Sequence, residues 1–128
     1  MARSQPRPTD AELAILRVLW ERGASTVRQV HEILAGTRDT GYTTTLKLMQ
    51  IMADKGLVTR NETERTHVYS ASAGREQTQS QLVQDLVDRA FGGSAATLVL
   101  RALSADGTSA AELREIRKLI DDYREKQS

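Results

Sequence analysis

Four polar side chains between residues 43 and 50 are spaced so that a helix would gather them on one side. At about 100° per residue, Thr43, Lys47, Gln50 and Asp54 share one face, and Thr44 lies beside it. Threonine hydroxyls and lysine ammonium groups contact phosphates, whereas lysine can also donate to guanine and glutamine can pair with adenine in the major groove. The pattern therefore predicts a helix whose exposed side has the chemistry to contact DNA.

The rest of this stretch predicts how such a helix would be held. It should run from about Thr43 to Lys55, with Gly56 as the residue that ends it. Leu46 and Ile51 flank the polar side, where they could meet thymine methyl groups or pack under the following segment. An ordinary amphipathic helix with a solvated face would show the same pattern, so the neighbouring elements decide the interpretation. The side expected to face the core carries Thr45, Leu48, Met49 and Met52.

Two helices are predicted before this stretch, and each begins with the spacing of a capping box. Thr9 and Glu12 form the first box, and Gly23 ends that helix. Ser25 or Thr26 opens the second helix, with Gln29 three residues after Thr26, and Gly36 ends it. The apolar residues expected to face inward are Leu13, Leu16, Val18, Leu19 and Trp20 in the first helix and Val27, Val30, Ile33 and Leu34 in the second.

Two short alternating segments after Gly56 predict a β-hairpin. The strands are expected at 57–60 and 66–69, joined by a charged turn at 61–65. Arg60, Arg65 and His67 are candidate phosphate contacts, although a cross-strand structural role fits His67 equally well. A helix followed directly by a hairpin, after two helices, is the arrangement of a winged helix-turn-helix. We expect this domain at residues 9–72, after a flexible arm at residues 1–8. Arg28 and this arm are left open as DNA contacts.

From residue 73 to residue 128 the sequence predicts helices only. The first spans about 75–91 and ends at Gly92, Ser94 caps the second, and Ser109 with Glu112 forms the box of the third. Short helices with one apolar side cannot bury that side by themselves, so pairing with a second copy of the chain is favoured over folding back onto the first domain. The residues expected to form this dimer contact are Leu82, Leu86, Phe91, Leu98, Leu100, Leu103, Leu113, Ile116 and Ile120.

Composition narrows the function further. The 128 residues have a net charge of only +1, so no strong overall field marks a nucleic-acid-binding protein. There is no cysteine, and His31 is interpreted as a half-exposed helix residue, so we expect no metal site and no cofactor. No phosphate-binding glycine loop, nucleophile elbow or paired-carboxylate motif indicates an enzyme. Without an apolar segment long enough to enter a membrane, a cytoplasmic location is expected.

Four segments, taken in order, carry a family pattern: PTDAELAILRVLWERGASTVRQVHEIL, YTTTLKLMQIMADKGLV, ERTHVYSA and FGGSAATLVLRALS. As a set they resemble the BlaI/MecI/CopY family of bacterial transcriptional repressors, of penicillinase-repressor type, over about residues 7–124. The resemblance implies a mainly α fold with a small β wing, in which a winged-helix DNA-binding domain precedes a helical dimerisation region. It also implies a homodimer that binds an inverted-repeat operator in double-stranded promoter DNA.

Three departures from the family pattern limit what the resemblance implies. The copper-responsive branch has a C-terminal cluster of metal-binding cysteines, which this chain lacks. Many members have arginine where Ile51 stands late in the recognition helix, so the operator sequence is left open. In the staphylococcal repressors a membrane sensor protease starts a signal that ends in cleavage between asparagine and phenylalanine. The corresponding residues here are Arg101 and Ala102, so relief by proteolysis in the dimerisation helices stays an open possibility.

Two functions of different classes follow from these patterns. The first is a dimeric, sequence-specific repressor whose third helix enters the major groove and whose wing touches the DNA backbone. The second is a winged-helix protein-interaction module that does not bind DNA, which the near-neutral charge allows. Association with duplex DNA that weakens steeply with salt separates the two.

Overall fold

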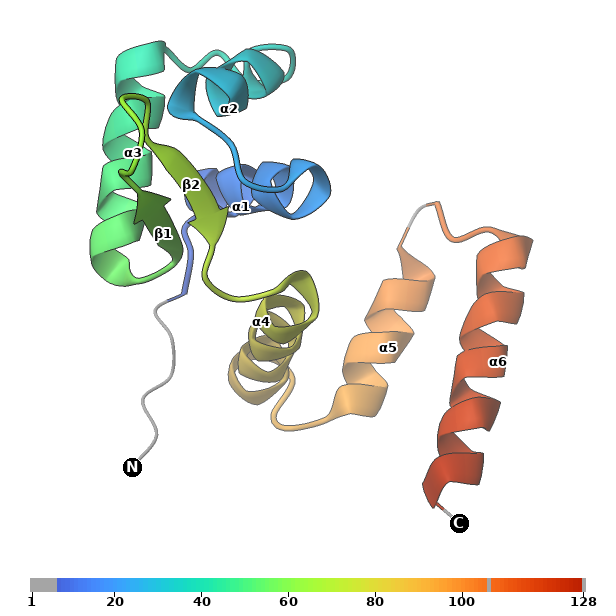
Figure 1. Cartoon of the computed structure of the whole chain (residues 1–128). Helices are drawn as coiled ribbons and strands as arrows, with labels where there is room; N and C mark the ends of the chain where they lie inside the picture. The colour runs from blue at the N-terminus through green and yellow to red at the C-terminus, as the bar shows by residue number, and fades with distance from the viewer. Residues whose placement is uncertain (1–6, 106, 128) are drawn as a thin grey trace. The chain divides into compact units, whose positions relative to one another are not determined.

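The computed structural model describes residues 7–105 and 107–127, and over these residues the chain forms six helices and one two-stranded antiparallel sheet. Most of residues 1–8, the predicted arm, lies outside the described part. The elements follow the order α1 (Asp10–Arg22), α2 (Val27–Leu34), α3 (Tyr42–Lys55), β1 (Val58–Asn61), β2 (Val68–Ala71), α4 (Arg75–Ala90), α5 (Ala95–Ser104) and α6 (Ala110–Gln127). Figure 1 shows them along the chain.

The chain divides into two compact units, Met1–Leu82 and Val83–Ser128. The first contains α1, α2, α3 and the hairpin, and the second contains α5 and α6. The helix α4 runs across the boundary, so it contributes residues to both units.

Local side-chain hydrogen bonds explain where the first two helices begin. The Thr9 hydroxyl accepts from the Glu12 amide at 3.2 Å, and the Glu12 carboxylate accepts from the Thr9 amide at 2.9 Å. Thr26 and Gln29 repeat this arrangement at the start of α2, at 3.2 and 2.9 Å. Each box satisfies two amides that have no partner within the helix. The capping boxes predicted for α1 and α2 are confirmed.

The core of the first unit is aliphatic apart from one tyrosine. The sequence interpretation was wrong for Ile33, which is 44% exposed, and it overlooked Ile15, which is 1% exposed. In an eight-residue α2 the buried stripe follows Val27, Val30 and Leu34, and Ile33 falls to one side of it. The buried core residues are Ile15, Leu16, Val18, Leu19, Val27, Val30, Leu34, Met49, Met52, Leu57, Val58 and Tyr69.

The hairpin forms, but its second strand begins two residues later than predicted. The register pairs Val58 with Ala71 and Asn61 with Val68, so residues 62–67 all belong to the connection. The Asn61 side chain closes the start of this turn by accepting from the Thr63 amide at 3.0 Å. On its other edge β2 pairs with Ser25, through amide-to-carbonyl hydrogen bonds of 3.0 and 2.8 Å between Ser25 and Tyr69. This second pairing places β2 against the loop that precedes α2.

The predicted C-terminal helices are also present. Ser94 caps α5 by accepting from the Thr97 amide at 3.1 Å, and Ser109 accepts from the Glu112 amide at 3.0 Å at the start of α6. None of the residues of α5 and α6 is buried within one chain. Among the helices described, none combines the length and the apolarity needed to cross a membrane.

Candidate nucleic-acid interface

The helix α3 has one buried side and one exposed polar side. Thr45, Met49 and Met52 are fully buried, and they attach α3 to the core. The opposite side is formed by Thr43, Thr44, Lys47 and Gln50, all of them exposed. Ile51 lies next to them with 37% of its surface exposed, whereas Leu46 is packed against the core. The structure therefore leaves exposed Thr43, Lys47 and Gln50, which the sequence placed on one face, together with Thr44 beside them.

The first turn of α3 has no side-chain cap, unlike the first turns of α1, α2 and α5. Its N-cap residue is Gly41, which provides no side-chain hydrogen bond to the helix. The Thr45 hydroxyl donates to the Gly41 carbonyl at 3.2 Å, and this bond explains how a threonine is accommodated in the core. The amides that begin a helix point outward and attract anions when no side chain covers them. Thr43 and Thr44, both exposed, belong to this first turn.

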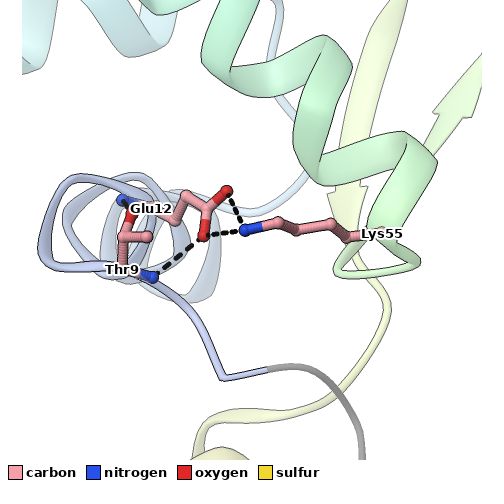
Figure 2. A network of polar contacts seen from close by, with 3 residues as sticks. All are labelled: Thr9, Glu12 and Lys55. Atoms are coloured by element: carbon pink, nitrogen blue, oxygen red, sulfur yellow. Dashed lines mark hydrogen bonds and ion pairs between the residues drawn. The ribbon is translucent and has the colours of Figure 1, made fainter.

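The other end of α3 is fixed to α1 by a buried ion pair, which Figure 2 shows. The Lys55 ammonium group donates to both carboxylate oxygens of Glu12 at 2.9 Å, while Glu12 also accepts from the Thr9 amide. Glu12 is 1% exposed, although it is charged. Burial by itself would raise the pKa of the Glu12 carboxyl, but the hydrogen bonds from Thr9 and Lys55 and the Lys55 charge outweigh it and lower the pKa below 4.5. The same carboxylate thus caps α1 and holds the end of α3.

The predicted phosphate contacts of the wing are accessible to solvent, but the Glu62 carboxylate lies beside two of them. Glu62 lies 3.4 Å from the Arg60 guanidinium and 3.7 Å from the His67 imidazole. Hydrogen bonding to the Tyr69 side chain, with the Glu62 charge, raises the pKa of Arg60. His67 precedes β2, so its neighbour is this turn carboxylate rather than a residue across the ladder. Arg65, at the tip of the wing, is exposed.

Cationic side chains without an acidic partner are the groups of α3 and the wing that can bind a polyanion such as DNA. Over the described residues, no carboxylate lies within ion-pair distance of Lys47 or Arg65. An exposed cation without a protein partner can neutralise a phosphate at no cost in broken ion pairs. Lys47 on α3 and Arg65 on the wing are therefore available, whereas Arg60 must first separate from Glu62.

A second group of residues beside α3 was not among the predicted contacts. The Arg28 guanidinium lies over the ring of Tyr42, 5.4 Å from its centroid, and the His31 ring meets Tyr42 edge-on at 5.8 Å. Tyr42 is the first residue of α3, and it is 40% exposed. The sequence could not predict this contact, because residues 28 and 42 belong to different helices. Its only indication was an aromatic residue at the start of a helix.

The residues predicted to form a dimer contact remain accessible in one chain. Leu86, Leu100, Leu113 and Ile120 are 46 to 53% exposed. The remaining five are half-buried: Leu82, Phe91, Leu98, Leu103 and Ile116. Further large apolar residues on the same helices are exposed as well, namely Val83, Val99, Leu119 and Tyr123. Their role in dimerisation stays a prediction, as does the role of the α3 and wing residues in contacting DNA.

Three helices, an antiparallel hairpin after the third, and an exposed polar face on that third helix define a winged helix-turn-helix protein. Comparison with known sequences leads to the same class. The sequence model of the penicillinase repressor family, Penicillinase_R, matches residues 8–122, and the chain belongs to this family. The fold class and the family resemblance expected from the sequence are confirmed.

Individual relatives differ in how much of the chain they match. "Transcriptional regulator BlaI" of Mycobacterium tuberculosis is 39% identical over 82 residues, which is 63% of this chain but only 59% of that protein. "Penicillinase repressor" of Bacillus licheniformis is 21% identical over 119 residues, 93% of each chain. Among solved structures, the monomeric form of Bacillus licheniformis BlaI in complex with the blaP half-operator superimposes with a TM-score of 0.51. That match has 21% identity and covers 59% of this chain and 92% of the other.

Proposed function

We propose that the protein is a DNA-binding transcriptional repressor that acts as a homodimer on an inverted-repeat operator. In this proposal α3 enters the major groove, and the wing lies along the adjacent backbone. Thr43, Thr44, Lys47 and Gln50 contact the groove and its phosphates. Arg60, Arg65 and His67 contact the backbone from the wing.

The exposed polar face of α3 is the observation that carries this proposal. Its buried side fixes the helix in the core, and the ion pair of Glu12 with Lys55 holds its C-terminal end. Lys47 is exposed in the middle of the face and has no carboxylate partner among the described residues. A rigid helix that presents polar donors is what direct reading of base edges requires. Membership of a repressor family, and the half-operator complex of a relative, support the same function.

The homodimer is inferred from the C-terminal helices. The helix α5 has ten residues, and isolated helices shorter than about 12–15 residues are marginal in water. It therefore needs a packing partner, yet none of its residues is buried within one chain. Burial of the exposed leucines of α5 and α6 against a second copy would supply that partner. Two linked half-site contacts would then bind an operator far more tightly than one.

Relief of repression by cleavage is compatible with this arrangement. Arg101 and Ala102 are exposed, but both lie inside the helical turns of α5. A protease binds an extended chain, so cleavage there requires α5 to unwind first. A membrane sensor protease of the same system is the partner that the resemblance implies for this step. Incubation of the dimer with that protease, followed by mass spectrometry, would place the cut.

The first experiment selects the operator from a randomised duplex library and then measures binding to it by fluorescence anisotropy at several salt concentrations. A scrambled duplex is the control. We expect enrichment of an inverted repeat, and tight binding to it that weakens steeply with salt. The alternative function, a protein-interaction module, predicts no enrichment and no salt-dependent binding to either duplex. That result would refute the proposal.

A substitution tests the role of α3 directly. Lys47→Ala should weaken binding to the selected duplex by about tenfold, because each protomer loses one contact to phosphate or base. Lys118→Ala is the matched control, since it removes the same charge from an exposed lysine of α6. Circular dichroism should show both variants folded. Affinity of the Lys47 variant within twofold of the wild type would refute the assignment of α3.

The dimer has its own test. Ile120→Lys places a charge in the apolar stripe of α6 and should yield a monomer in sedimentation equilibrium. Ala111→Lys adds the same charge on the opposite side of α6 and should leave the dimer intact. A wild-type protein that stays monomeric at high concentration would favour apolar helices that fold back within one chain.

A further inference from the structure

Arg28 and Tyr42 form a contact that the proposed function has not used. The guanidinium of Arg28, the second residue of α2, lies 5.4 Å from the centroid of the Tyr42 ring, at the start of α3. The His31 ring stands edge-on against the same tyrosine, at 5.8 Å and an interplanar angle of 88°. Arg28 is exposed, and Tyr42 is 40% exposed. The Tyr42 ring thus contacts His31 along one edge and the Arg28 guanidinium over its face.

The Arg28 guanidinium lies over an aromatic ring and has no acidic partner among the described residues, since no carboxylate of these residues lies within ion-pair distance of it. A guanidinium in cation–π contact with an aromatic face still has N–H groups that remain available to an acceptor. Stacking also restricts a side chain that is otherwise flexible, so less conformational entropy is lost when it binds. A phosphate, with two oxygens facing the fork, is the acceptor that best matches it.

The position of the pair indicates which phosphate that would be. Tyr42 precedes Thr43 and Thr44 in the first turn of α3, and Lys47 follows one turn later. In Figure 1 the start of α2 lies beside the start of α3 within the first unit. A helix that inserts into the major groove has DNA backbone beside its N-terminal end. Arg28 therefore stands where α2 would meet that backbone.

We propose that Arg28 binds a phosphate of the DNA backbone, and that Tyr42 is the positioning residue that holds its guanidinium in place. The proposal rests on the proposed function, because it assigns a further contact to the same interface. The competing explanation is that the pair only packs α2 against α3. The two differ in a measurable way, since a packing role affects stability and a phosphate contact affects the salt dependence of binding.

The test measures anisotropy on the selected operator duplex and on the scrambled duplex, from about 50 to about 200 mM salt. Arg28→Ala should reduce the slope of log affinity against log salt by about 0.9 for each protomer bound. Affinity should fall by the same factor on both duplexes, because a phosphate contact carries no base specificity. The matched control is Arg22→Ala, which removes an exposed arginine at the end of α1, away from α3 in Figure 1.

Tyr42 is tested by two variants. Tyr42→Phe keeps the ring and should bind as the wild type does. Tyr42→Leu removes the stacking surface and should lose part of what Arg28→Ala loses. If the ring acts through the guanidinium, the double variant of Arg28→Ala with Tyr42→Leu should bind no more weakly than Arg28→Ala alone. Additive losses would assign Tyr42 a separate contact and overturn its positioning role.

Two further results would overturn the proposal, and they are distinguishable. A wild-type slope in Arg28→Ala, together with weakened binding in Lys47→Ala, would leave the repressor function standing and reject Arg28 as a phosphate contact. A lower melting temperature of Arg28→Ala with that unchanged slope would identify the pair as packing only. Absence of salt-dependent binding by the wild-type protein would reject both the function and this contact.

Discussion

Replacing Lys55 by methionine tests how the end of α3 is held. Glu12 is 1% exposed, and its two carboxylate oxygens each lie 2.9 Å from the Lys55 ammonium group (Figure 2). The substitution leaves a buried carboxylate that keeps the hydrogen bond from the Thr9 amide but has lost its cation. Removal of one member of a buried ion pair costs about 3–5 kcal/mol in folding free energy. The Lys55 side chain is 34% exposed, so water moderates the loss, and we expect about 2 kcal/mol.

The pH dependence of that loss identifies its cause. Because the pKa of Glu12 in the folded protein is lower than its ordinary value of 4.5, Glu12 stabilises the wild type above about pH 4.5. This stabilisation disappears as the pH falls through the lowered folded pKa. In Lys55→Met the effect of burial is opposed only by Thr9, so the folded pKa of Glu12 rises. The stability difference between the two proteins should therefore be largest at neutral pH and should narrow below about pH 4.5.

Urea unfolding followed by circular dichroism, at about pH 7 and about pH 3.5, measures this difference. At neutral pH the variant should also melt roughly 10 °C lower, as expected for a small domain. The control is Arg89→Met, which breaks an exposed pair with Asp85 at 3.6 Å and should cost less than about 0.5 kcal/mol. A loss that is equal at both pH values would show that Lys55 contributes through packing and not through the Glu12 charge.

Three further substitutions, one of them with a matched glycine control, test other parts of the fold and the wing. Glu62→Gln removes the carboxylate that pairs with Arg60 and lies near the His67 imidazole, so affinity for the selected duplex should rise several-fold in anisotropy, with a steeper salt slope. Trp20→Phe loses the 3.0 Å hydrogen bond from the indole N–H to the Ala73 carbonyl and should cost about 1 kcal/mol in urea unfolding. Gly56→Ala should cost about 1–2 kcal/mol, because φ is +83° in open space, whereas Gly36→Ala should be nearly neutral. Unchanged affinity of Glu62→Gln would contradict the role given to its carboxylate. Unchanged stability of Trp20→Phe would contradict the role of the indole hydrogen bond, and unchanged stability of Gly56→Ala would contradict the backbone strain expected there.

Much of the fold follows from signals that act within one helical turn. The capping boxes at Thr9 and Thr26 and the glycine after α3 define helix ends through hydrogen bonds and backbone angles of neighbouring residues. The period of α3 separates its buried side from its polar side for the same reason. Each of these features was predicted correctly, because the residues that decide it are three or four positions apart.

The errors arise where distant segments decide the outcome. Ile33 is apolar and lies on an amphipathic helix, yet it faces outward because α2 packs through a narrower stripe. The second strand begins at Val68 because its partner residues on β1 and at Ser25 select the register. The alternation of residues within a single strand is compatible with several registers. Pairing of β2 with β1 and with Ser25 selects one of these registers.

By itself, the sequence determined the kinds and order of the elements, the polar face of α3 and the family. Only the tertiary structure revealed which charges are paired. The bond between Glu12 and Lys55 joins residues 43 positions apart, and the one between Trp20 and Ala73 spans 53 positions. It likewise showed Glu62 against the wing cations and Arg28 over Tyr42. Local propensity depends on a few consecutive residues, whereas side chains meet across a core only after every helix has packed, so the pattern of unpaired cations emerges with the fold.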